Sequence, residues 1–239
     1  MNGFRQIGWL IHKDLALQFR TKDTLVLIFV FSVLVVLIFS FAFGPIFPQA
    51  PEERGKLAAS VLWAAFAFAG IITLNRSFDI ERVHGALHGI RLAGVDPSNF
   101  YLSKVISISV FLAMLEVIVT PIALQFLEVF DTLPISVQEK LIQTLLKLIG
   151  VLAIGTLGFC AVGVTVSGIS TSTHGKESLL SVILLPLISP VIMAGAKCTV
   201  SLLTTGGLEG NFHWFSILVV YSLMFLASSY LLFEFVIEE

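Results

Sequence analysis

The sequence predicts an all-α integral membrane protein with six transmembrane helices and an N-terminal amphipathic helix at the membrane interface. Hydrophobic residues make up 56% of the 239 residues and charged residues 13%, whereas a soluble domain has about 45–50% and about 25%. The hydrophobic residues collect in six runs, and each run is long enough to cross the roughly 30 Å of bilayer hydrocarbon as a helix. No run shows the alternating pattern of a transmembrane barrel.

Charge and cysteine content exclude two other classes of protein. A net charge of −2 without a basic tail argues against a nucleic-acid-binding chain. Two cysteines are too few for a domain built on disulfides. We therefore expect one transmembrane domain over residues 1–239, with spans at 25–43, 57–74, 105–127, 148–170, 179–196 and 215–233.

Residues 1–24 are predicted to form a cytoplasmic interfacial helix. The first span is too long for a signal peptide, and a mostly polar segment precedes it. Apolar residues recur at steps of three and four from Phe4 to Phe19, while Arg5, Lys13 and Arg20 fall between them. This pattern predicts an amphipathic helix on the membrane surface. Two interpretations stay open: an anchor for the first span, and an elbow that contacts a cytoplasmic partner.

The distribution of lysine and arginine predicts the orientation of the chain. These residues are more frequent in 1–24, 75–104 and 171–178 than in the connections on the opposite side. Cytoplasmic loops carry the excess of positive charge. Both termini are therefore predicted to lie in the cytoplasm.

The longest cytoplasmic connection, 75–104, is interpreted as a coupling segment. Asp96 followed by Pro97 predicts the N-cap and first residue of the third helix. Before them, the second helix is expected to continue to about residue 84, and a short apolar ridge follows. An exposed apolar ridge favours docking on a partner, and a solvated loop is the alternative. The expected contact residues are Phe78, Glu81, Arg82, Gly85 and Leu87.

Two of these residues have a specific expected role. Glu81 is expected to pair with a basic residue of the partner, because ion pairs with charged donors are strong and directional. Gly85 is expected to permit a left-handed turn, because glycine has no Cβ.

Three connections are expected on the outer side. The segment 43–51 contains three prolines and Gly44, which predicts a rigid turn. A capping-box pattern at 136–139 predicts that the fourth helix begins there, at the membrane interface. The segment 197–214 is longer than a turn requires, and we expect it to dip into the outer leaflet.

Glu116 is the charged residue in the central part of the predicted spans. Because a charge at this depth is costly, it is expected to find a hydrogen-bonding partner in the bundle, such as Thr156 or Ser181. Two interpretations stay open: a structural hydrogen bond that fixes helix packing, and a conformational pivot or cargo contact.

Prolines and small residues predict local helix geometry. Pro121, Pro186 and Pro190 each remove a backbone hydrogen bond, and the last two predict a kinked or broken fifth helix. Small residues repeat along the fourth span, where they let helix backbones approach closely. We interpret this stripe as a packing surface.

The sequence contains no recognisable catalytic or nucleotide-binding motif. It lacks the P-loop, the His-Glu-x-x-His motif and the Gly-x-Ser-x-Gly motif. A transporter driven by an ion gradient would need several buried ionisable groups, and only Glu116 is present. We therefore expect a non-enzymatic subunit, with ATP hydrolysis on a separate subunit.

Two groups of residues resemble a known family. The arrangement of Glu81, Gly85-Ala-Leu87, Pro97 and Lys104 resembles the signature loop of ABC type-2 exporter permeases. A second group, Thr156-Leu-Gly-Phe159 with Leu179-Leu-Ser181 and Leu185-Pro-Leu-Ile-Ser-Pro190, resembles the haem exporter protein B family of cytochrome c maturation. The resemblance extends over the whole chain in length and number of spans. His88 departs from the pattern, which has a glutamate there.

The resemblance implies a permease in a bacterial-type inner membrane that pairs with an ABC ATPase subunit. It also implies contact with other cytochrome c maturation proteins, including a haem chaperone, and a homo-oligomer within the complex. The subunit would either carry haem or release the haem-loaded chaperone. No firmly bound cofactor and no metal are expected, although haem is a conceivable cargo.

A haem cargo directs attention to the histidines. His84 and His88 would share one helix face, so they cannot bind opposite faces of one haem. His213 beside Trp214, at the outer end of the last span, is the best-placed candidate for contact with haem. Aromatic residues are also ordinary at the membrane interface, and this alternative stays open.

Three other functions remain as alternatives. The chain could be a type-2 exporter permease for a lipid or drug, or an assembly scaffold that transports nothing. An intramembrane enzyme that uses Glu116 with a histidine is a further class, but no histidine lies at membrane depth.

Overall fold

The computed structural model describes residues 3–20, 22–44, 50–83, 94–171 and 177–238. The long helices are α1 (Gly3–Arg20), α2 (Lys22–Phe43), α3 (Pro51–Val83), α5 (Pro97–Phe126), α7 (Leu141–Thr171), α8 (Glu177–Thr205) and α9 (Phe212–Glu238). A short helix α6 (Ile135–Gln138) and the 3-10 turns η2 (Phe130–Thr132) and η3 (Glu209–Asn211) lie between them. Six of these helices contain stretches long and apolar enough to cross a membrane: α2, α3, α5, α7, α8 and α9. The all-α membrane architecture is confirmed.

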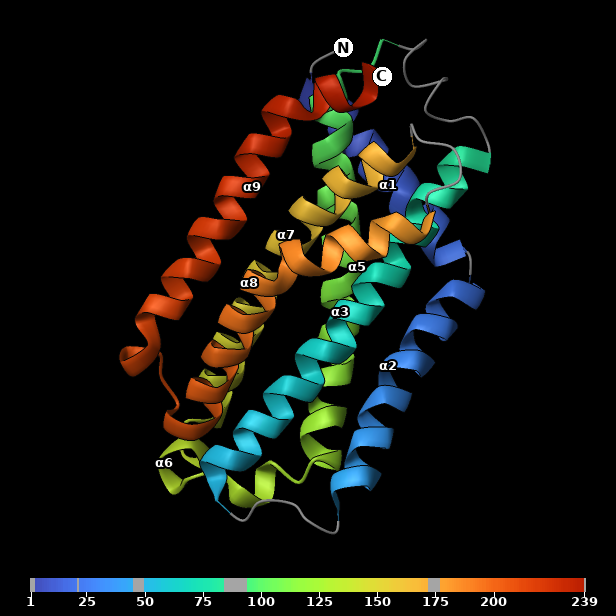
Figure 1. Ribbon diagram of the computed structural model, residues 1–239. Helices are drawn as coiled ribbons and strands as arrows, with labels where there is room; N and C mark the ends of the chain where they lie inside the picture. The colour runs from blue at the N-terminus through green and yellow to red at the C-terminus, as the bar shows by residue number, and fades with distance from the viewer. Residues whose placement is uncertain (1–2, 21, 45–49, 84–93, 172–176, 239) are drawn as a thin grey trace.

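The six long apolar helices form one bundle, with α2 and α9 at its two edges (Figure 1). Figure 1 also shows α1 against the bundle near the end that holds both termini. An even number of spans places the two termini on the same side, as the orientation argument requires.

Both helices of the predicted coupling segment extend further than the apolar runs indicate. α3 continues to Val83 and α5 already begins at Pro97, so much of 75–104 is regular helix. Hydropathy identifies only the part of a helix that meets hydrocarbon, and therefore misses its polar ends. Asp96 caps α5 as predicted, because its Oδ1 accepts a 2.9 Å hydrogen bond from the Ser98 N–H. Residues 84–93 lie outside the described residues.

Two expectations for the outer side are wrong. The fourth long helix does not begin at 136, because α6 is a separate turn with Pro134 at its N-cap and α7 begins at Leu141. The expected long loop at 197–214 is mostly helix, since α8 continues to Thr205. Gly206 ends α8 with φ 71°, where glycine is favoured, and its N–H donates to Leu202 O at 3.0 Å.

The two prolines of the fifth span bend their helix without breaking it. Pro186 and Pro190 both lie inside α8, and α8 changes direction along its length in Figure 1. Each proline removes one backbone hydrogen bond, which is the usual cause of such a bend. Of the two predicted alternatives, a kinked or a broken fifth helix, the structure shows the kinked helix.

Three glycines of the small-residue stripe on α7, Gly155, Gly158 and Gly163, are packing positions as predicted, whereas Gly150 has open space beside it. A methyl group at Gly155 would come within 2.3 Å of the Trp63 ring, and one at Gly195 of α8 within 2.1 Å. The indole of Trp63 thus lies between two glycines, and its Nε1 donates a 3.0 Å hydrogen bond to Thr199 Oγ1. This contact joins α3, α7 and α8 in the centre of the bundle.

Gly195→Ala is expected to destabilise the protein by about 1–3 kcal/mol, because overpacking a close-packed site forces the indole of Trp63 to move. Gly150→Ala on α7 is the matched control, since no atom lies within 4 Å of a methyl group there. Thermal unfolding of the detergent-solubilised protein measures both. Equal unfolding temperatures for the two variants would contradict the packing role of Gly195.

Candidate functional site

Four charged side chains from three helices meet at the end of the bundle that holds the termini. We name this set the charge cluster: Lys13 and Asp14 of α1, Glu81 of α3 and Lys104 of α5. Lys104 Nζ lies 3.1 Å from Asp14 Oδ2 and 2.9 Å from Glu81 Oε1. Lys13 Nζ lies 3.1 Å from Asp14 Oδ1 and 3.0 Å from Glu81 Oε1. Each lysine therefore bridges both acids.

Three of the four members of the charge cluster are buried, and the cluster is electrically balanced. The exposed fraction is 3% for Asp14 and Glu81 and 2% for Lys104. Two lysines and two carboxylates cancel in formal charge. Buried charges are tolerated only when they are paired and hydrogen-bonded, because removal from water costs several kcal/mol per ion. Any change that removes one member of the cluster therefore leaves an unbalanced buried charge.

Neutral groups complete the surroundings of Lys104. Its Nζ donates to Ser77 Oγ at 3.2 Å, and Ser107 Oγ donates to Asp14 Oδ2 at 3.4 Å. The rings of Phe78 and Phe100 each lie with their centroid 5.8 Å from Lys104 Nζ, within the range of a cation–π contact. The second carboxylate oxygen of Glu81 is buried without a hydrogen-bond partner among the described residues.

Lys13 is the most accessible member of the charge cluster, with 39% of its side chain exposed. Burial alone would lower the pKa of Lys13, but the charges of Glu81 and Asp14 outweigh burial and raise the pKa above its ordinary 10.5. A raised lysine pKa gives stabilisation that is complete below the unfolded value and is lost as pH rises through the folded value. Lys13 is therefore charged across the physiological range, and its contribution is lost only under strongly alkaline conditions.

The structure places the predicted coupling residues differently from the expectation. Phe78 and Glu81 are buried inside the chain's own bundle. Glu81 binds Lys13 and Lys104 of the same chain, so the expectation that it is free for a partner's basic residue is wrong. The side chain of Arg82, and Gly85 and Leu87 entirely, lie outside the described residues.

Sequence reasoning missed Asp14 and the role of Lys104. A signal for Asp14 was present in the sequence, because it continues the apolar face of α1 in register with Ile7 and Leu10. The structure then shows Asp14 to be 3% exposed. An acid on the inner face of an amphipathic helix needs a cation opposite it. Which lysine supplies that cation depends on how α1 crosses α5, and no sequence spacing encodes this crossing.

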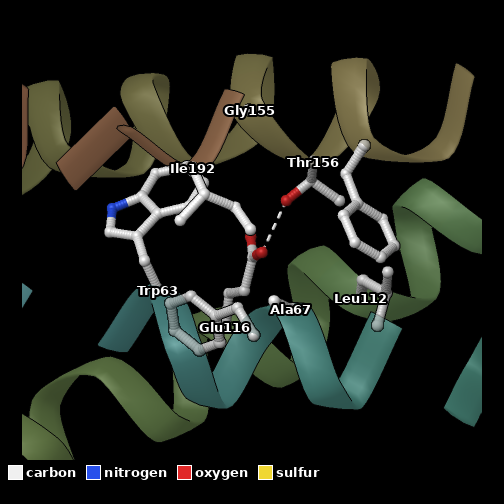
Figure 2. Close-up of a pocket in the computed structure, with 9 residues that line it drawn as sticks. Trp63, Ala67, Leu112, Glu116, Gly155, Thr156 and Ile192 are labelled. Atoms are coloured by element: carbon white, nitrogen blue, oxygen red, sulfur yellow. Dashed lines mark hydrogen bonds between the residues drawn. The ribbon is translucent and has the colours of Figure 1, made fainter. Parts of the chain in front are cut away.

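Glu116 occupies a second polar site, in the middle of the bundle (Figure 2). Thr156 Oγ1 of α7 donates a 2.5 Å hydrogen bond to Glu116 Oε1, which confirms the predicted hydroxyl partner. Figure 2 shows the carboxyl group directed between Trp63 of α3 and α7, with Ile192 of α8 nearby. The cavity beside it is about 10 Å³, room for about one water molecule. The side chain of Ser181 lies outside the described residues.

The structure also places the remaining predicted site residues. Pro121 lies inside α5, one turn and one residue beyond Glu116. His213 and Trp214 lie in the first turn of α9, with ring centroids 5.2 Å apart, and His213 is exposed. Within the described ranges, no three His, Cys, Asp or Glu side chains gather in a group that could hold a metal ion. A haem contact at His213 stays a prediction.

Comparison with known proteins is consistent with this architecture. The family model described as CcmB protein matches residues 5–236 of the chain. A relative named "Heme exporter protein B" from Haemophilus influenzae is 24% identical over 184 residues, which covers 77% of this chain and 76% of the relative. The family match extends over nearly the whole length and includes the charge cluster, Glu116 and all six spans. The chain belongs to the CcmB family.

Proposed function

We propose that this chain is the permease subunit of an exporter in cytochrome c maturation, and that a separate ABC ATPase subunit drives it. Membership of the CcmB family and the name of the Haemophilus influenzae relative support a haem-exporter permease subunit. The six long apolar helices support a multi-pass membrane protein. We assign it to the cell inner membrane with both termini in the cytoplasm, on the distribution of Lys and Arg.

The observation that carries the coupling mechanism is the charge cluster. It joins α1, α3 and α5 where α3 ends and α5 begins, next to the predicted coupling segment. A force applied between α3 and α5 would therefore reach two spans and α1 together, because packed helices transmit motion as rigid elements. Arg82, Gly85 and Leu87 remain the proposed contacts with the ATPase subunit. Phe78 acts from inside, through its contact with Lys104.

The size of the cavity at Glu116 bears on the cargo. A space of about 10 Å³ admits a water molecule and not a haem. This favours either movement of haem along a surface between subunits or ATP-driven release of a haem-loaded chaperone. Both fit a complex that contains the ATPase subunit, other maturation proteins and a second copy of this chain.

Two measurements test the proposed function. Loss of the gene is expected to remove c-type cytochromes while b-type cytochromes remain, as read from haem-stained gels and spectra. A tagged chain is expected to co-purify with an ABC ATPase subunit whose hydrolysis depends on it. Normal c-type cytochromes with altered lipid or drug export would favour a permease for another cargo. Assembly of partners without any ATP dependence would favour a scaffold.

A further inference from the structure

α1 is attached to the bundle differently from the spanning helices. Besides the charge cluster, Asn99 Nδ2 of α5 donates to Gln6 Oε1 at 3.3 Å. An aromatic contact, Phe19 with Phe111 at 6.3 Å between ring centroids, adds an apolar component. The packing of the Trp63 ring against Gly155 and Gly195, by contrast, is so close that no methyl group fits at either glycine. Polar contacts can be replaced by water, whereas separation of a close-packed apolar interface exposes apolar surface.

The charge cluster consists of two neutral pairs, one within α1 and one between α3 and α5. Lys13 and Asp14 are neighbours on α1 and already lie 3.1 Å apart. Glu81 and Lys104 lie on the bundle and are 2.9 Å apart. If α1 moves away, each part keeps one cation and one anion in contact. The departure of α1 therefore leaves no uncompensated buried charge, which is the main cost of breaking a buried ion pair.

α1 is also a separate element of the chain. α1 (Gly3–Arg20) and α2 (Lys22–Phe43) run in different directions in Figure 1, so α1 does not extend the axis of the first span. Ion clusters of this kind add little net stability, and their best-attested role is to specify a register or a switch between states.

We propose that α1 is a detachable helix: during the transport cycle it separates from α3 and α5 between the Lys13–Asp14 pair and the Glu81–Lys104 pair, and then returns. This inference rests on the proposed ATP-driven cycle, and it identifies the interface between α1 and the helices α3 and α5 as the one that opens. In the closed arrangement α1 covers Ser107, which is fully buried and contacts Asp14. In the open arrangement Ser107 becomes accessible.

Thiol labelling in the intact complex with its ATPase subunit tests the proposal. Ser107→Cys is labelled with a water-soluble maleimide, with and without ATP. The native Cys160 and Cys198, both buried, serve as internal controls in the parent chain and should stay unreactive. We expect ATP to raise the labelling rate at position 107 several-fold.

A cleavable tether tests whether the movement of α1 causes that exposure. Gln6→Cys/Asn99→Cys is joined with a short disulfide-containing crosslinker in the Ser107→Cys background before ATP is added, while position 107 is buried. Maleimide labelling is then read at position 107 alone, by mass spectrometry of the peptide that contains it. The tether should abolish the ATP-dependent change, and a reductant should restore it. Gln6→Cys/Leu10→Cys, joined within α1, is the matched control and should leave the change intact.

The outcomes separate this inference from the proposed function. If the complex hydrolyses ATP but position 107 stays as inaccessible as before, α1 does not detach, although the permease assignment stands. Exposure that persists with the tether in place would equally overturn the inference. Should Ser107→Cys not assemble, the ATP dependence of crosslinking yield in Gln6→Cys/Asn99→Cys gives the same decision, because a yield unaffected by ATP contradicts detachment.

Discussion

Lys104→Met is expected to destabilise the protein by about 3–5 kcal/mol, the usual cost of removing one partner from a buried ion pair. The methionine fills a similar volume but leaves two buried carboxylates, Asp14 and Glu81, with only Lys13 to neutralise them. The loss should appear as a lower midpoint of chemical or thermal unfolding in detergent, and as less protein in the membrane.

The second substitution restores the balance of charge. Adding Glu81→Gln to Lys104→Met leaves one cation and one anion, Lys13 and Asp14, which already lie in contact. We expect the double variant to be more stable than Lys104→Met alone, because the uncompensated charge has gone. Lys56→Met is the surface control, since Lys56 is exposed and pairs with Glu52 and Glu53, and exposed pairs add little. A double variant no more stable than the single one would show that charge balance is not what holds the site.

The fold class follows from the sequence because the bilayer imposes it. A run of apolar residues that crosses hydrocarbon must be helical to satisfy its backbone, so the six spans could be recognised individually. Hydropathy alone does not give their ends, because Asn75 to Val83 form helix beyond the apolar run. For the same reason the segment 197–214 was wrongly expected to be a loop, although its first half, 197–205, belongs to α8. The predicted end near residue 84 and the predicted start at Pro97 rest instead on helix-terminating and capping residues, and the structure confirms both.

The Glu116 site could be predicted from the sequence, whereas the charge cluster could not. A carboxyl group at membrane depth needs a hydrogen-bonding partner, so the sequence predicts a hydroxyl such as Thr156 or Ser181 beside Glu116, and the structure shows Thr156 in that position. Asp14 and Lys104 are far apart in sequence, and their helices do not cross the membrane side by side as consecutive spans do. Their pairing depends on the position of α1 on α5, which only the three-dimensional structure provides.

Glu116→Leu is expected to reduce stability strongly, whereas Glu116→Gln should be tolerated. Gln keeps an acceptor for the Thr156 hydroxyl and similar volume, so the hydrogen bond between α5 and α7 survives. Leu removes the acceptor and leaves a buried hydroxyl without its partner, a loss of about 1–3 kcal/mol. Membrane abundance and the unfolding temperature in detergent measure this difference, and Thr156→Val should resemble Glu116→Leu.

The function of the Glu116→Gln variant distinguishes the two interpretations of this residue. Glu116 is 6% exposed and lines the same cavity as Trp63, and that cavity admits about one water molecule. This geometry favours a structural hydrogen bond over contact with a large cargo. We therefore expect Glu116→Gln to support normal levels of c-type cytochromes. If this variant inserts and assembles normally but c-type cytochromes are lost, the ionisable carboxyl group itself takes part in the cycle, and the structural interpretation is wrong.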